Sequence, residues 1–228
     1  MLTPERRRGV EILDDPAVDP SIRARSMQDV ARSNRLFGGL RAPVIELRAV
    51  TAALAEHATL LDVGTGTADI AEHVRATARA AGAPLRTIGV DAAPSLLAAA
   101  QARVDDAVCA SALALPFRDH SVDVVLCSQL IHHFDFADAA RVLTELNRVA
   151  RHAVIIADLR RSWLAAAGFW LASFPLRFHA VTRHDGVTSV LRGFTTRELA
   201  DLVRAATGAE PRVQRRLGFR VTARWQPT

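Results

Sequence analysis

From Thr59 to Leu159 the chain alternates between short apolar runs, rich in β-branched residues, and longer Ala-rich segments with helical spacing. The runs "TLLDVG", "RTIGVD", "DAVCA", "VDVVLCS" and "HAVIIADL" predict strands, and "TADIAEHVRATARAAG", "APSLLAAAQARV" and "FADAARVLTELNRVA" predict the helices between them. Because parallel strands need crossover connections, this alternation predicts a parallel, doubly wound sheet. The pattern restricts the fold to the α/β class.

The segments before Thr59 and after Leu159 do not show this alternation. Residues 1–50 have helical spacing and no strand signals, so we expect an N-terminal helical extension before a main domain over residues 51–228. Beyond Leu159 we expect an apolar helix near "WLAAAGFWLASF", a loop around "HAVTRHDGVTS", a helix in "TTRELADLVRAAT" and a closing β-hairpin in "PRVQRRLGFRVTARW". The chain therefore predicts one α/β domain with an appended helical element.

The charge of the chain does not indicate a nucleic-acid partner. The net charge is +5, but all 29 basic residues are Arg, spread from Arg6 to Arg224, and there is no Tyr to stack on bases. We expect no nucleic acid, no membrane span and a cytoplasmic location. Cys109 and Cys127 lie in small-apolar or β-branched runs and are expected to be reduced core residues rather than metal ligands.

A glycine-rich turn follows the first expected strand, in "LLDVGTGTADI". At the carboxyl edge of a parallel sheet, Gly64 and Gly66 would let a ligand approach the backbone without a Cβ in the way. The dinucleotide fingerprint G-x-G-x-x-G is not complete, because Asp69 stands at its third glycine position. A turn that serves only tight packing is the alternative.

Further segments indicate which ligand the glycine turn would bind. "TIGVD" ends at Asp91, where a carboxylate accepts hydrogen bonds from ribose hydroxyls, although a helix-capping role is also possible. With "LPFRDHSVDVV" and "SQLIHHF", the segment from Leu60 to Leu159 resembles the class I S-adenosylmethionine-dependent methyltransferases. The resemblance implies a Rossmann-like, mostly parallel seven-stranded sheet with a C-terminal β-hairpin, and S-adenosyl-L-methionine as the cofactor.

The same resemblance implies roles for individual residues. The first motif would hold the methionine moiety, the acid after the second strand would hold ribose, and the residues after the third strand would face adenine. Many relatives have Asp where Ser111 stands, so the adenine contact departs from the family pattern. The expected cofactor-binding set is Asp62, Gly64, Thr65, Gly66, Asp91, Ala92, Ser111, Ala112 and Ser128.

His132 and His133 follow the fourth expected strand, beside the expected cofactor. Histidine is well suited to remove a proton near neutral pH, so either residue is a candidate general base, with packing or capping as the alternative. Neighbouring residues on a helix diverge by about 100°, which predicts that at most one faces the substrate. For the same reason we do not expect the pair to bind zinc, and we expect no metal.

A second resemblance lies in "SVLRGFTTREL", which is similar to a segment of the ubiquinone and menaquinone C-methyltransferases. "DLRRSW" and "TRHDG" resemble methyltransferases that accompany bacterial type III polyketide synthases. These likenesses imply that Arg192 holds a phenolate or quinone oxygen, and that His184 with Asp185 forms a base and its orienting partner in a loop. The alternative is an ordinary turn at Asp185-Gly186.

The sequence therefore predicts a methyltransferase of secondary metabolism that acts on a small, apolar aromatic acceptor such as a phenol or hydroquinone, by O-methylation. C-methylation of a quinone precursor is one alternative, and a nucleic-acid-binding or RNA-modifying protein is another. A homodimer is possible. Met27, Val30, Leu36 and Phe37 are expected to close over the acceptor as a lid, together with "WLAAAGFWLASFPL".

Overall fold

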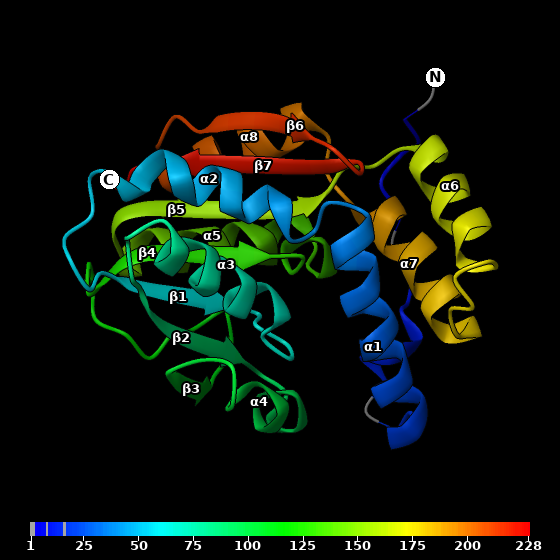
Figure 1. The fold of residues 1–228 in the computed structure, drawn as a ribbon. Helices are drawn as coiled ribbons and strands as arrows, with labels where there is room; N and C mark the ends of the chain where they lie inside the picture. Colours follow the sequence, from blue (N-terminus) through cyan, green and yellow to red (C-terminus); the bar gives the residue numbers. More distant parts are fainter. Residues whose placement is uncertain (1–2, 8, 16) are drawn as a thin grey trace.

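Seven strands form one sheet in the order β3-β2-β1-β4-β5-β7-β6 in a computed structural model that describes residues 3–7, 9–15 and 17–228 (Figure 1). Neighbouring strands from β3 to β5 are parallel, whereas β7 is antiparallel to β5 and β6. The mostly parallel sheet and the C-terminal hairpin are as expected. The strands are β1 (Thr59–Val63), β2 (Arg86–Asp91), β3 (Asp106–Cys109), β4 (Val122–Ser128), β5 (Ala150–Leu159), β6 (Arg212–Arg216) and β7 (Arg220–Trp225).

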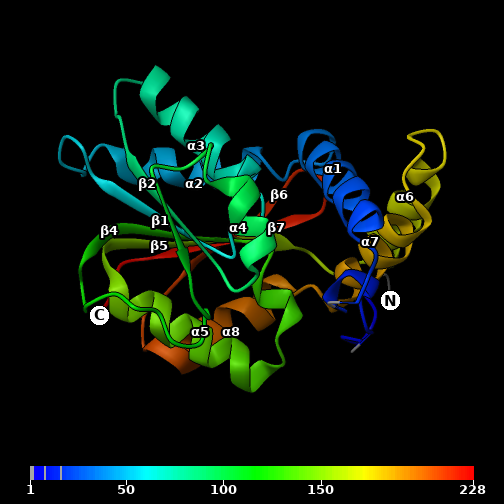
Figure 2. The same cartoon turned by 90° about the horizontal axis from the view of Figure 1, so that it is seen from below.

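Helices cover both faces of the sheet. In Figure 2, α2 and α3 lie on one face, and α5 and α8 lie on the other. The α-helices are α1 (Pro20–Leu36), α2 (Arg41–Thr51), α3 (Asp69–Ala80), α4 (Pro94–Ala100), α5 (Phe136–Val149), α6 (Trp163–Ser173), α7 (Ala180–Arg192) and α8 (Thr196–Thr207). Two 3-10 turns, η1 (Ile12–Asp14) and η2 (Ile131–His133), complete the described elements.

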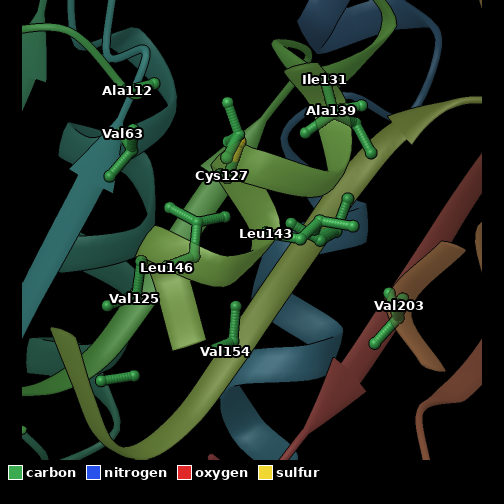
Figure 3. Close-up of a cluster of buried hydrophobic side chains, with 14 of the residues drawn as sticks. Val63, Ala112, Val125, Cys127, Ile131, Ala139, Leu143, Leu146, Val154 and Val203 are labelled. Carbon is green, nitrogen blue, oxygen red and sulfur yellow. The ribbon is translucent and has the colours of Figure 1, made fainter. Parts of the chain in front are cut away.

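The core has two layers because alternate residues of a strand point to opposite faces of the sheet. Leu61 and Val125 pack toward α5 and α8, where Leu143, Leu146 and Val203 are buried with them (Figure 3). The neighbouring residues of the same strands, such as Leu60 and Val124, pack toward α2 and α3. The central strands are therefore buried on both faces, which explains their nearly continuous apolar sequence.

The structure divides the segment expected as an N-terminal extension. Helix α2 packs on the sheet, where Val44 and Leu47 join the core layer of β1. Helix α1 instead lies with α6 and α7 at the carboxyl end of the parallel strands (Figure 1). Residues 1–2, 8 and 16 of the expected extension lie outside the described residues. None of the described helices is both long and apolar enough to cross a membrane.

The expected loop around "HAVTRHDGVTS" is wrong, because these residues form helix α7. Gly186 does not make a turn there. A Cβ at Gly186 would lie 2.1 Å from Cε1 of Phe169, so the glycine lets α6 and α7 pack closely. The neighbouring Asp185 carboxylate accepts the backbone N–H groups of Ile12 and Leu13, at 2.8 and 2.9 Å. Asp185 and Gly186 therefore contact η1 and α6, which are distant in sequence, and do not form a local turn.

Candidate active site

A cavity of about 970 Å³ lies where the parallel strands end. One part of its wall comes from the turn after β1 and the ends of β2 and β4, and the other from η1, α1, η2, α6 and α7. Of the residues expected in the site, the cavity is lined by Gly64, Thr65, Gly66, Asp91, Ser128, His132 and His133. The structure therefore brings the glycine turn and both histidines to one cavity.

The glycine turn is held to β2 by backbone hydrogen bonds. The N–H groups of Gly64 and Thr65 donate to the carbonyl of Val90, at 2.8 and 2.9 Å. Gly66 donates its N–H to Oδ2 of Asp91, at 2.9 Å. Gly64 has φ +75° and Gly66 has φ +55°, a left-handed conformation that favours glycine. The tight turn expected from the sequence is present, and Asp91 orders it.

Asp62 lies beneath the turn and is almost fully buried. Its Oδ2 accepts a hydrogen bond from the Thr65 hydroxyl at 2.8 Å, while its Oδ1 is buried without a partner. Burial raises the pKa of Asp62 to about 7. The hydroxyl of Ser128 is also buried without a partner. Unpaired acceptors beside an open glycine turn fit the charged amino group of a methionine moiety.

His132 forms a buried pair with an acid that the sequence analysis did not single out. Its Nδ1 lies 2.6 Å from Oδ1 of Asp158, and the side chains are only 3% and 0% exposed. Burial alone would raise the pKa of Asp158, but the charge and hydrogen bond of His132 lower it below its ordinary value. An ionised Asp158 fixes the proton of His132 on Nδ1. In the neutral imidazole this tautomer leaves Nε2 as the proton acceptor.

His133 lies against the same cavity with different partners. Its ring centroid is 4.4 Å from that of His132, so the expectation that the two side chains diverge is wrong. Both residues lie in the short 3-10 turn η2, and the Nε2 atoms of both rings face the carboxylate of Glu11. Burial would lower the pKa of His133, but the hydrogen bond with Asp14 and the charges of Glu11 and Asp14 raise it.

Glu11 approaches both histidines from the N-terminal segment. Its carboxylate oxygens lie 4.0 Å from Nε2 of His132 and 3.9 Å from Nε2 of His133. The donor atoms of these three residues are close enough to surround a metal ion, so divergence of the rings no longer argues against one. Arg192, however, already places a positive charge 2.9 Å from Oε1 of Glu11. The negative charge of Glu11 is therefore already partly neutralised by Arg192.

Other expected site residues lie outside the cavity lining. The guanidinium of Arg192 pairs with Glu11 and Asp14. His184 is 52% exposed and bonds the neighbouring Asp185. Arg192 thus contacts the N-terminal segment, His184 contacts its own neighbour in α7, and neither lines the cavity. Ala92, Ser111 and Ala112 are likewise not among the lining residues.

Sequence reasoning missed two acids of this site. Asp158 could have been noticed, because it ends an apolar strand in "IIADL" as Asp91 does in "TIGVD". Glu11 gives no comparable signal. It is buried only because Ser189 and Arg192, on α7, bind its Oε1 at 2.8 and 2.9 Å across more than 170 residues. Both residues belong to the "SVLRGFTTREL" segment.

Residues 61–157 match the sequence profile of a family described as a methyltransferase domain. No sequence among the curated proteins matches the chain. The matched segment contains the glycine turn, Asp91, Ser128 and the two histidines. It therefore coincides with one side of the cavity and ends just before Asp158.

Solved structures share the fold at low sequence identity. A methyltransferase from Aquifex aeolicus has a TM-score of 0.63 and 18% identity, covering 92% of this chain and 99% of its own. A possible histamine N-methyltransferase from Thermotoga maritima has a TM-score of 0.56 and 21% identity, covering 88% and 97%. Magnesium protoporphyrin IX methyltransferase from Synechocystis PCC 6803, with bound cofactor, has a TM-score of 0.55 and 10% identity, covering 96% and 89%.

The fold and the glycine-turn site define a nucleotide-cofactor enzyme of the doubly wound α/β class. The methyltransferase domain matched over residues 61–157 makes this protein an S-adenosylmethionine-dependent methyltransferase, and the solved structures share its fold. Its cofactor is S-adenosyl-L-methionine, which becomes S-adenosyl-L-homocysteine after transfer.

Proposed function

We propose that this enzyme transfers the methyl group to a hydroxyl of a small, largely apolar aromatic acceptor. The observation that carries the proposal is the buried pair of His132 and Asp158, of which His132 lines the cavity. A phenol must lose its proton as its oxygen accepts a methyl group, and a histidine with a free Nε2 can take that proton.

The cofactor supplies a methyl group on a positively charged sulfur, so the protein needs to contribute alignment, water exclusion and proton removal. In this proposal, Asp62 and the glycine turn hold the methionine moiety, and Asp91 holds the ribose hydroxyls. Asp158 keeps the imidazole of His132 in one orientation and one tautomer. His132 removes the phenolic proton through Nε2.

The acceptor side of the cavity is largely apolar. Met27, Val30 and Phe37 line it from α1 and the residue after it, while Leu164 and Phe169 line it from α6. We propose that these helices form the lid expected from the sequence and exclude water during transfer. An apolar aromatic body fits such a wall better than a nucleic acid, whose phosphates require clustered cations.

The proposal is tested with purified enzyme, S-adenosylmethionine and a panel of alkylated phenols and hydroquinones, with products identified by mass spectrometry. Fragmentation distinguishes a methyl ether from C-methylation of the ring, which is the alternative outcome for a quinone precursor. If no phenolic or quinol compound is methylated, the proposed acceptor class is wrong.

Two variants test the role of the pair. His132→Gln and Asp158→Asn should each lower kcat by about a hundredfold or more, because general-base catalysis contributes about 10² to 10⁴ in rate. Binding of S-adenosylhomocysteine should stay within a few-fold of wild type. His152→Gln is the control, since that histidine lies on β5 near the opposite end from Asp158 and is 46% exposed. Unchanged kcat in folded His132→Gln would rule out the proton-removal step.

A further inference from the structure

Arg220 is a buried cation that the proposed chemistry does not use. It begins β7, paired with Leu159 at the carboxyl end of β5, and its side chain lines the cavity. The residue is only 4% exposed. Its Nε donates to the carbonyl of Phe37 at 3.1 Å, whereas Nη1 is shielded from solvent and has no hydrogen-bond partner.

Among the described residues, the arginines near the cavity differ in their partners. Arg192 pairs with Glu11 and Asp14, and Arg161 pairs with Glu198 at 2.6 Å. Arg23, which also lines the cavity, donates to two backbone carbonyls. In the part of the chain that the structure describes, no ion pair joins Arg220 to a carboxylate, and its Nη1 has no hydrogen-bond partner. Its positive charge is not matched by a direct contact with an acid.

Leaving a guanidinium buried without an anionic partner is energetically expensive, because desolvation is not repaid by a close opposite charge. Burial lowers the pKa of Arg220 to about 10, although the negative charge of Asp158 acts in the opposite direction. Asp158 itself is committed to His132. A ligand that brings an anion into the cavity would relieve this cost.

The surroundings of Arg220 specify what kind of ligand this is. Phe37, Leu159 and Phe219 line the cavity with it, and they are apolar. A small inorganic anion would leave these side chains uncovered. An aromatic carboxylic acid would meet both requirements. Its apolar ring would cover these side chains, and its carboxylate would bind the guanidinium through two parallel hydrogen bonds.

We propose that Arg220 forms an anion-binding subsite for the acceptor, so that the preferred acceptor is an apolar aromatic acid that also carries the hydroxyl to be methylated. This inference rests on the proposed function, because it deepens the acceptor class. Arg220 pairs with Leu159, the residue after Asp158, across β5 and β7, so the subsite lies near the His132 and Asp158 pair. Arg220 would position the acid while His132 faces the hydroxyl.

The test is a binding measurement that needs no turnover. Calorimetry is used to titrate 3-hydroxy-5-pentylbenzoate, and separately its methyl ester, into full-length enzyme saturated with S-adenosylhomocysteine. Wild type should bind the acid about 30-fold or more tightly than the ester, as expected for hydrogen bonds to a charged group. Arg220→Met should bind the two equally, with weaker binding of the acid rather than tighter binding of the ester.

Two controls accompany this test. Arg215→Met removes an exposed arginine from β6 of the same hairpin and should keep the wild-type preference. Arg220→Lys keeps a positive charge and should keep a reduced preference for the acid. It replaces Arg220→Met if that variant does not fold. Thermal melts verify folding in each case.

Equal binding of acid and ester by wild-type enzyme overturns the inference without any variant. It is also overturned if Arg220→Met weakens S-adenosylhomocysteine binding while the acid preference survives, since Arg220 would then hold the cofactor's own carboxylate. If the acid binds with an Arg220-dependent preference but no hydroxyl is ever methylated, the subsite stands and the proposed O-methylation fails.

Discussion

The two sides of the cavity are built in different ways. On the cofactor side, Asp62, the glycine turn and Asp91 come from a short stretch of chain, and backbone N–H groups of the turn donate most of the hydrogen bonds that hold it. On the acceptor side, Glu11, His132, Asp158 and Arg192 come from four distant segments, and side-chain contacts join them. One side depends on local backbone geometry, and the other depends on long-range packing.

This difference has a functional consequence. The backbone turn can serve any acceptor, because it contacts only the cofactor in the proposed mechanism. The acceptor side instead depends on a short N-terminal segment that Arg6 and Arg161 anchor. Arg6 stacks 4.4 Å from the ring centroid of Phe194, and Nε of Arg161 donates to the carbonyl of Pro4 at 2.8 Å. Changes on the two sides should therefore affect different steps.

The largest effect is expected on the cofactor side. Gly64→Val should abolish detectable cofactor binding, because a β-branched residue is strained at φ +75° and its Cβ would lie 2.7 Å from a methyl carbon of Leu130. Calorimetry with S-adenosylhomocysteine measures this. Gly82→Val is the matched control, since Gly82 has φ +76° but no atom within 4 Å of a built Cβ and does not line the cavity. Similar cofactor affinity in folded Gly64→Val would contradict the assignment of the turn.

A smaller effect, confined to transfer, is expected on the acceptor side. Deleting residues 1–15 removes Glu11 and Asp14 and opens the wall beside His133. Methyl transfer should fall about a hundredfold because alignment and water exclusion are lost. Cofactor affinity should stay within a few-fold. The comparison of kcat with S-adenosylhomocysteine affinity checks this prediction. A folded truncation with a normal transfer rate would show that the segment only adds stability.

The smallest effect is a pH dependence on the cofactor side. Because burial raises the pKa of Asp62 to about 7, the free enzyme holds this group mostly protonated at pH 6 and mostly ionised at pH 8. Affinity for the cationic amino group should therefore rise about tenfold over this interval, with proton release on binding at pH 6. Calorimetry in buffers of different ionisation enthalpy measures both. Asp62→Asn should remove the dependence, and a flat wild-type profile would contradict the role of Asp62.

The same shift has a defined sign for stability. An acid whose folded pKa is raised above its unfolded value of 3.8 disfavours the folded state once it ionises. The ligand-free enzyme should therefore lose stability from this group as pH rises from about 4 to 7. Pairing Asp62 with the cofactor would offset that loss, so protection by the cofactor should increase with pH.

Prediction from the sequence succeeded where local pattern decides structure. The spacing of apolar residues changes between strand and helix periods along the chain, and glycines mark the turn after the first strand. The sheet and the residues Gly64, Gly66 and Asp91 could therefore be located from the sequence. It failed at Asp185-Gly186, where a turn dipeptide lies inside α7. There, packing of Gly186 against Phe169 and the bonds from Asp185 to η1 outweigh local preference.

The sequence by itself thus determined the α/β class, the glycine turn and the order of the motifs that hold the cofactor, because these depend on residues close together in the chain. Only the tertiary structure decided that His132 pairs with Asp158, that Arg192 pairs with Glu11 of the N-terminal segment, and that Arg220 lines the cavity. The physical reason is that a buried side chain chooses its partner among all segments packed around it, and separation along the sequence does not limit that choice.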